Sequence, residues 1–250
     1  MKRTLAATAV VLLAATGLSA CGYNETLGRN QLVLVDEGSL VTAGAQAWAQ
    51  TLQRSKLSTN AAANARVRTV ASRIVQAAGL GGRPWEYAVF DNSQPNAFAL
   101  PGGKIGVNTG LLALVENDDQ LAAIIGHEVG HTVARHAAER MSQQAAAQVA
   151  LGVAQGAIGG SNAQQIGALG GAGAQLGILL PFSRTHELEA DRLGVDYMQR
   201  AGYRPSQAIR LWEIMAAKGG AGTPQFLSTH PTDATRIAAL REYLRSRGWS

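Results

Sequence analysis

The strongest chemical signal in the sequence is the segment His127-Glu128-Val129-Gly130-His131. Residues four apart on an α-helix project from one face, so the imidazoles of His127 and His131 can bind one metal ion. Glu128 would then lie beside that ion, where its carboxylate can take a proton from a metal-bound water. A buried helical turn with these three side chains favours a catalytic zinc ion, one per chain, over a pair of satisfied surface histidines.

A catalytic zinc ion takes three protein ligands and leaves a fourth position to water. The third ligand must come from elsewhere in the chain. No His-x-x-Gly-x-x-His continuation follows His131, which disfavours the metzincin arrangement. The segment from Ser183 to Asp191 carries a dense group of candidate side chains, and a second helix is predicted over His186 to Arg200. These candidates are His186, Glu187, Glu189 and Asp191.

Together, HEVGH and the later run Glu187-x-Glu-Ala-Asp191 resemble the gluzincin zinc metallopeptidases. That family includes the CAAX prenyl endopeptidases, the bacterial heat-shock protease HtpX and the mitochondrial protease Oma. The run over 95–105 and the Ser-Thr-His-Pro segment that ends at Pro231 extend the resemblance, which spans about residues 85–236. With no run of further transmembrane helices and no long C-terminal repeat region, the chain most resembles the compact bacterial periplasmic lipoprotein members.

The resemblance implies roles for four residues. Glu187 is implied to be the third zinc ligand, and Asp191, one turn further, to orient a ligand histidine from behind. His230 is implied to lie in a loop that reaches the site, where it either stabilises the transition state or fills the open zinc position. Arg236 is implied to support the site, behind the ligands or at the developing oxyanion.

The other polar side chains of these segments are expected to matter less. Glu189 lies about 200° around the predicted helix from Glu187 and should face away. His186 points about 100° away from Glu187, so we expect an incidental neighbour or a support of the site. His136 follows His131 by five residues. It would lie off the ligand face of a continuous helix, where we expect it to be solvated.

Residues 1–20 are typical of a bacterial lipoprotein signal peptide, with Lys2 and Arg3 before an apolar run that ends at Cys21. Cys21 is the only cysteine, so no disulfide can form within the chain, and acylation would consume the thiol. Gly22, in place of an acidic residue, indicates sorting to the outer membrane. We therefore expect a lipid on Cys21, a lipidated tether over 21–38, and a location on the periplasmic face of the outer membrane.

The remainder, 39–250, is predicted to be one zinc metallopeptidase domain. Helical periodicity dominates, while alternating runs over 85–90 and 104–108 predict a small sheet beside the zinc helix. The predicted fold class is therefore α+β, mainly helical and zincin-like. The second strand is the expected substrate-binding strand, because an extended peptide can pair with a free strand edge. Its residues are Lys104, Ile105, Gly106, Val107 and Asn108.

An uncharged stretch rich in Ala, Gly and Gln separates Arg140 from Arg184. It forms an insertion over 142–182 in the predicted domain. Its composition fits a low-complexity insertion, and it fits equally a flap that covers the active site or touches lipid headgroups.

These expectations converge on a zinc-dependent endopeptidase that hydrolyses peptide bonds in unfolded or misassembled cell-envelope proteins. The net charge of +5 is too small and scattered to predict a nucleic-acid partner. One alternative is an envelope-assembly chaperone or scaffold with latent or lost proteolysis, which the intact Glu128 disfavours. A zinc amidase acting on cell-wall peptide is a second alternative, and the closeness of the resemblance disfavours it.

Overall fold

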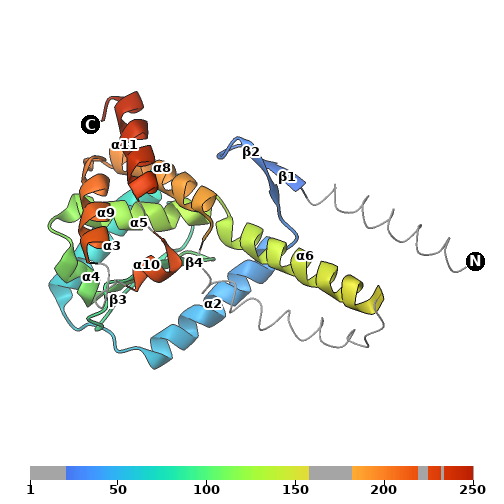
Figure 1. Ribbon diagram of the computed structural model, residues 1–250. Helices are drawn as coiled ribbons and strands as arrows, with labels where there is room; N and C mark the ends of the chain where they lie inside the picture. Colours follow the sequence, from blue (N-terminus) through green and yellow to red (C-terminus); the bar gives the residue numbers. More distant parts are fainter. Residues whose placement is uncertain (1–20, 158–181, 219–224, 232–233, 250) are drawn as a thin grey trace, which may run out of the picture.

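The computed structural model describes residues 21–157, 182–218, 225–231 and 234–249. The expected signal peptide and most of the 142–182 insertion lie outside the described residues. Helices form most of the described chain, and a small sheet lies beside the helix that carries HEVGH (Figure 1). The predicted fold class, α+β and mainly helical, is confirmed.

A three-stranded sheet contains β3 (Glu86–Phe90), β4 (Ala97–Leu100) and β5 (Lys104–Asn108), in the order β3-β5-β4. β5 is parallel to β3 and antiparallel to β4. Because β5 is paired on both sides, the expectation that residues Lys104 to Asn108 offer a free edge to substrate is wrong. Strand order depends on tertiary packing, which the local pattern does not contain. β3 and β4 are the two edge strands of this sheet, and β4 packs against the helix that carries HEVGH.

Helix α5 (Asp118–Val133) carries the HEVGH segment through the core. Asn117 caps its start by accepting a hydrogen bond from the N–H of Gln120 at 3.0 Å, and two acidic residues in the first turn complement the helix dipole. Every residue from Gln120 to His131 is buried. The metal-binding segment is therefore held by packing on all sides of its helix.

The helix that we expected to run continuously from His131 through His136 is interrupted at Arg135. α5 ends at Val133, Arg135 adopts the left-handed region with a φ of 57°, and α6 (His136–Ala157) begins directly afterwards. A non-glycine residue seldom adopts this φ, so residue types alone predict no turn here. The break redirects the chain and changes which side chains of α6 can reach the end of α5.

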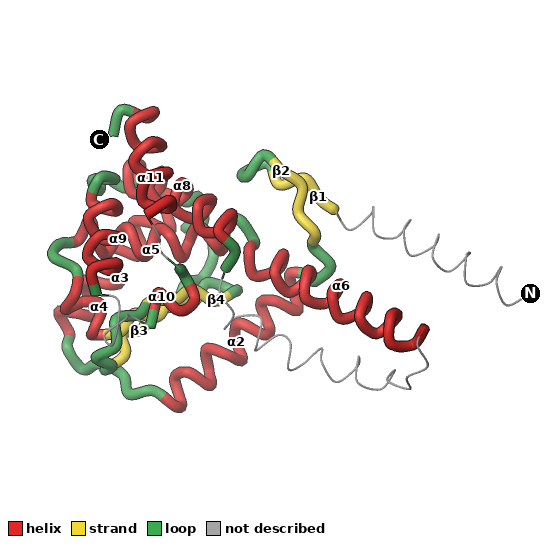
Figure 2. The backbone as a smooth tube through the Cα atoms, in the orientation of Figure 1, coloured by secondary structure: helices red, strands yellow, loops and turns green. Residues whose placement is uncertain are grey.

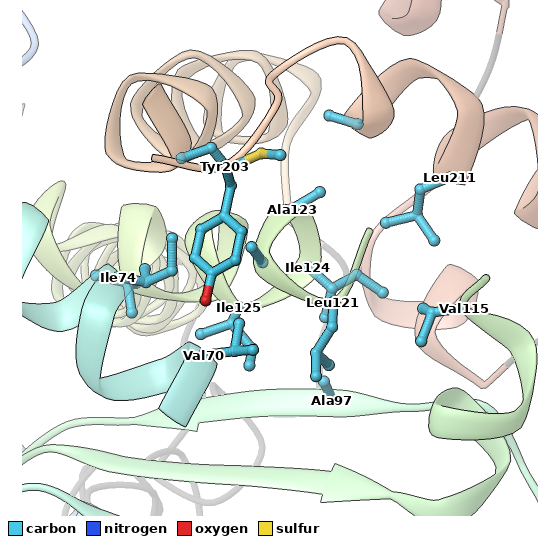
Figure 3. Close-up of a cluster of buried hydrophobic side chains, with 14 of the residues drawn as sticks. Val70, Ile74, Ala97, Val115, Leu121, Ala123, Ile124, Ile125, Tyr203 and Leu211 are labelled. Carbon is cyan, nitrogen blue, oxygen red and sulfur yellow. The ribbon is translucent and has the colours of Figure 1, made fainter. Parts of the chain in front are cut away.

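Helices on several sides enclose α5, namely α3 (Ala61–Ala77), α8 (Arg184–Arg200) and α9 (Gln207–Ala217). Figure 3 shows Val70 of α3 and Ile125 of α5 in one apolar cluster with Leu211 of α9. Burial of an aliphatic side chain of this size contributes about 1.5–3 kcal/mol. The site is therefore built on a helix that other described helices enclose.

Glycines bring α5 and α8 into backbone contact. A Cβ on Gly130 would lie 2.8 Å from the carbonyl oxygen of Ala190, and a Cβ on Gly194 would lie 2.8 Å from the amide nitrogen of His127. Neither fits unless the helices move apart. This close approach brings Glu187 of α8 opposite the imidazoles of α5.

The segment expected to be a tether contains a folded hairpin. β1 (Cys21–Asn24) pairs antiparallel with β2 (Arg29–Leu32), and α2 (Glu37–Arg54) follows. β2 packs on α6, separately from the three-stranded sheet (Figure 2). Residues 21–32 are therefore docked on the domain, while lipidation of Cys21 stays a prediction.

Three shorter or terminal helices complete the described structure: α4 (Thr109–Leu114), α10 (Phe226–Thr229) and α11 (Ala234–Arg247). The helix predicted over His186 to Arg200 is present as α8, which begins two residues earlier. Among the helices that the structure describes, none combines the length and apolar character needed to cross a membrane.

Candidate metal centre

Four buried side chains converge at the end of the zinc helix. α5 contributes His127 and His131, α8 contributes Glu187, and the residue after α10 contributes His230. One ligand atom from each lies within 4.8 Å of all the others. The structure therefore brings together the three residues expected to bind zinc and the one expected to reach the open position.

The distances within this cluster suit a small cation. The Nε2 atoms of His127 and His131 are 3.0 Å apart, and the two carboxylate oxygens of Glu187 each lie 3.4 Å from one of them. Two imidazole lone pairs and a carboxylate at this separation repel one another unless a cation or proton lies between them. Two histidine nitrogens and one glutamate oxygen are a known ligand set of catalytic zinc, so these residues fit that ion.

Glu128 faces this cluster from the side of β4. Its Oε2 accepts a hydrogen bond from the N–H of Ala99 at 3.0 Å. Its buried Oε1 accepts no hydrogen bond from the described residues and lies 3.3 Å from Nε2 of His230. One carboxylate oxygen is thus fixed by the sheet, and the other remains available for proton transfer.

His230 inserts between the ligands and Glu128. Its Nδ1 lies 3.1 Å from Nε2 of His127 and 3.1 Å from Oε1 of Glu187. The ring of Phe226 stacks on the imidazole at 4.3 Å, which holds its plane. A ring nitrogen of His230 can therefore serve as a fourth metal ligand without any rearrangement.

A buried ion pair supports His127 from behind. Nδ1 of His127 lies 2.9 Å from Oδ1 of Asp191, and Arg236 donates to both oxygens of that carboxylate at 2.6 and 2.8 Å. Burial alone would raise the pKa of Asp191, but Arg236 and His127 outweigh it and hold the pKa below its usual value. Asp191 thus remains a carboxylate that accepts the Nδ1 proton and leaves Nε2 free for metal.

Arg236 lies behind the ligands and not at the oxyanion. Its Nη1 is 2.6 Å from Oε2 of Glu187, and its guanidinium stacks over Trp212 at 4.4 Å. It is absent from the described residues that line the cleft. Of the two roles implied for Arg236, these contacts favour the supporting one, because the guanidinium is enclosed by Glu187, Asp191 and Trp212.

Three side chains expected to matter little form a support behind His131. His136 is fully buried, with Nδ1 at 2.8 Å from Nδ1 of His131, so the expectation of a solvated side chain is wrong. Nε2 of His136 lies 2.9 Å from Glu189, and its ring stacks on His186 at 4.3 Å. Burial lowers the pKa of His136 despite the nearby Glu189, so the ring is neutral at pH 7. The expectation assumed a continuous helix, and Arg135 breaks that helix.

Glu189 does point away from Glu187, as expected, but it binds a second partner in the N-terminal hairpin. Arg29 donates to Glu189 at 2.5 and 2.8 Å and to Glu139 of α6 at 2.8 Å. Burial opposes ionisation of Glu189, but the hydrogen bonds from Arg29 and His136 outweigh it and lower its pKa to about 2. Sequence reasoning missed Arg29 and Glu139, because no motif or helical spacing connects either residue with the metal-binding segment.

A cleft of about 1280 Å³ opens beside the cluster. Glu128, His131 and His230 line it together with β4 and parts of α2 and α6. All four residues of β4, Ala97 to Leu100, line the cleft. The arrangement can therefore admit an extended polymer to a metal ion and a proton acceptor.

These features define a class of protein. Two imidazoles on one helical turn, a carboxylate from a second helix and an unligated glutamate beside them are the arrangement of a gluzincin-type metallopeptidase. The chain belongs to peptidase family M48, whose sequence model matches residues 61–244. This zinc-dependent family agrees with the ligand set that the structure brings together.

The chain is similar to mitochondrial and bacterial proteases. The mitochondrial metalloendopeptidase OMA1 of Schizosaccharomyces pombe is 39% identical over 180 residues, which is 71% of this chain and 52% of that protein. OMA1 of Saccharomyces cerevisiae is 34% identical over 173 residues, 66% of this chain and 48% of that protein. The β-barrel assembly-enhancing protease of Escherichia coli K12 is 31% identical over 184 residues, which is 70% of this chain and 37% of that protein. The chain thus spans about half, or less, of the length of these curated relatives.

Proposed function

We propose that this chain is a zinc-dependent endopeptidase that hydrolyses peptide bonds in unfolded or misassembled proteins of the bacterial cell envelope. The observation that carries the proposal is the position of Glu128. Its Oε1 is buried without a hydrogen bond from the described residues, and the residue lines the same cleft as His131. A purely structural zinc site has no use for an unligated carboxylate at this point.

The residues of the site have two roles, which are metal binding and proton transfer. His127, His131 and Glu187 would hold the ion, which when bound polarises a peptide carbonyl and lowers the pKa of a neighbouring water. Glu128 accepts the proton of that water through Oε1 and later donates it to the leaving amine. The hydrogen bond from Ala99 keeps Oε2 on the sheet, so Oε1 stays directed at the reaction.

The free edge of β4 is the proposed substrate-binding strand, in place of β5. The N–H of Ala99 points away from β5 and towards Glu128, so this edge runs beside the proton acceptor. An extended peptide that pairs with β4 would present its backbone to the site. Main-chain pairing demands little of the substrate sequence, which suits unfolded polypeptides.

His230 is proposed to restrain the enzyme at rest. Its Nδ1 already lies among the ligand atoms, where it would fill the position that water needs. His230→Ala should then raise basal proteolysis of an unfolded substrate. A loss of about 100- to 1000-fold would instead assign His230 to transition-state stabilisation.

A lipid on Cys21 is proposed to hold the protein at the periplasmic face of the outer membrane. The residues before Cys21 and the similarity to the bacterial β-barrel assembly-enhancing protease support this location. Cys21→Ser should be released from membranes, since several acyl chains hold a protein firmly and none would remain. Membrane association that survives the substitution would place the anchor elsewhere.

The decisive experiment compares Glu128→Gln with Glu242→Gln, a matched change at an exposed position of α11. Purified full-length protein is incubated with unfolded casein and, separately, with peptidoglycan fragments, and bound zinc is measured in each variant. Glu128→Gln should keep about one zinc and lose roughly 100- to 10,000-fold in casein cleavage, while Glu242→Gln should match the wild type. Undiminished cleavage by Glu128→Gln, or cleavage of peptidoglycan alone, would refute the proposal. A wild-type protein that binds zinc and assists folding without cleavage would indicate the chaperone alternative.

A further inference from the structure

A chain of polar contacts runs from His131 to the N-terminal hairpin. His131 contacts His136 at 2.8 Å, and His136 contacts Glu189 at 2.9 Å. Glu189 in turn accepts two hydrogen bonds from Arg29 of β2. The hairpin therefore reaches to within three contacts of a candidate zinc ligand, although Arg29 precedes that ligand by more than a hundred residues in the sequence.

Along this series of contacts, the protons have one arrangement that is consistent with metal binding. If Nε2 of His131 carries a metal, its proton resides on Nδ1 and is donated to Nδ1 of His136. His136 then carries its own proton on Nε2 and donates it to the carboxylate of Glu189. Arg29 only donates, so it satisfies Glu189 without competing for the acceptor role. Every donor in this series of contacts then meets an acceptor.

The reverse arrangement would disable the ligand. A proton on Nδ1 of His136 would be donated towards His131, whose own proton would then move to Nε2 and face Glu187. In that case Nε2 of His136 would turn its lone pair towards the carboxylate of Glu189, which is unfavourable. Glu189 therefore selects the tautomer of His136, and through it the tautomer of His131.

Glu189 can do this only if it is held in place. Its side chain is 13% exposed and that of Glu139 is 6% exposed, and Arg29 binds both carboxylates. Without a cation between them, these two nearly buried carboxylates would repel each other. The bidentate geometry of a guanidinium fixes the plane of each carboxylate, which an ammonium group cannot do.

We propose that Arg29 is a positioning residue of the metal centre, which holds Glu189 and thereby fixes the orientation and tautomer of His136 and of His131. The inference rests on the proposed role of His131 as a zinc ligand. It also assigns a new role to the segment after Cys21. This hairpin is a part of the metal site and more than a connection to a membrane.

Gln31 provides a matched control within the same strand. Its Nε2 donates to Glu139 and to the carbonyl oxygen of Ala134, both at 2.8 Å, so it docks the hairpin without touching Glu189 or His136. Gln31→Met keeps the volume and removes these hydrogen bonds. Any effect of Arg29→Met that exceeds that of Gln31→Met therefore reports on the contact with Glu189 and not on docking in general.

The test measures zinc affinity of the full chain by competition with a chromogenic chelator, together with the visible spectrum of the cobalt-substituted protein. Arg29→Met should bind zinc about 10- to 100-fold more weakly and show an altered cobalt spectrum, while Gln31→Met should stay close to the wild type. Arg29→Lys keeps the charge without the bidentate geometry, so its affinity should be intermediate. Circular dichroism confirms that each variant is folded, and Arg29→Lys carries the test if Arg29→Met is not.

The outcomes separate this inference from the function on which it rests. If the wild-type chain binds no zinc, the proposed function is overturned and this inference with it. If the wild type binds zinc and the Arg29 variants bind it equally well, only the inference is overturned. Equal losses in Arg29→Met and Gln31→Met would also overturn it, because hairpin docking would then explain both.

Discussion

The two histidines of the zinc helix are supported in different ways. His127 contacts Asp191 directly, and Arg236 of α11 neutralises that carboxylate; all three side chains are buried. His131 contacts a second imidazole, that of His136, and the neutralising arginine comes from the N-terminal hairpin. The first support lies inside the segment matched by the family model, and the second reaches outside it.

The difference shows two solutions to one requirement. Each ligand must keep its proton on Nδ1, so each needs an acceptor that cannot release a proton in return. A carboxylate paired with arginine meets this need directly behind His127. Behind His131 the break at Arg135 inserts His136, so the carboxylate acts through one additional ring. The longer support depends on more elements, and we expect it to be the weaker of the two.

The largest expected effect is that of Asp191→Ala. It removes the acceptor of His127 and leaves Arg236 buried without its main partner, which costs about 3–5 kcal/mol of unfolding free energy. Zinc binding should be lost as well. Urea denaturation and zinc titration measure both quantities, with Asp91→Ala as a control. Asp91 pairs with Lys56 at an exposed site, so that change should cost no more than about 1 kcal/mol. A small loss in Asp191→Ala would mean that the two supports do not differ as described.

The second effect concerns the longer support. His136→Phe preserves ring volume and stacking on His186 but removes the acceptor of His131, so zinc affinity should fall by about 10- to 100-fold. His186→Phe is the matched control, since His186 contacts Glu139 and not His131. Chelator competition should show a clearly smaller change for His186→Phe. Equal changes in both variants would show that packing, and not the proton acceptor, is what His136 provides.

The sequence predicted one support and missed the other for a physical reason. HEVGH, Glu187 and Asp191 lie at helical spacings that local geometry and a family resemblance can interpret. The role of His136 depends on the left-handed conformation of Arg135, which no residue type there demands. Arg29 contributes through a contact between distant segments, and such contacts leave no periodic pattern. The same limit explains why the strand at 104–108 was predicted correctly as a strand but wrongly as an edge.

A third prediction tests whether the close packing of α8 against α5 positions the residues that surround His127. Gly194→Ala forces the backbone of α8 away from His127, against which its Cβ would lie at 2.8 Å. Overpacking of this kind typically costs about 1–3 kcal/mol, and the shift should weaken zinc binding because Glu187 and Asp191 move with α8. Gly82→Ala, where a Cβ meets nothing within 4 Å, is the control. Thermal unfolding and zinc titration of both variants decide the point, and unchanged zinc binding in Gly194→Ala would show that α8 can adjust.

The smallest predicted effect is the contribution of Glu139 to the pH dependence of stability. Burial would raise the pKa of Glu139, but hydrogen bonds from Arg29 and Gln31 outweigh it and lower the pKa below 4.5. The folded state therefore binds fewer protons than the unfolded state as the pH falls below that value. The stabilisation from Glu139 is thus complete above pH 4.5 and is lost on further acidification.

Glu139→Gln should consequently flatten the acid loss of stability in the metal-free protein. Below about pH 4.5 the slope of unfolding free energy against pH should fall by at most about 1.4 kcal/mol per pH unit, the value for one proton. Urea denaturation at several pH values between 6 and 3 provides the measurement, and the exposed Glu242→Gln should leave the slope unchanged. If Glu139→Gln also leaves it unchanged, Arg29 does not bind Glu139 in solution as it does in the structure, and the hairpin would then support His131 through Glu189 alone.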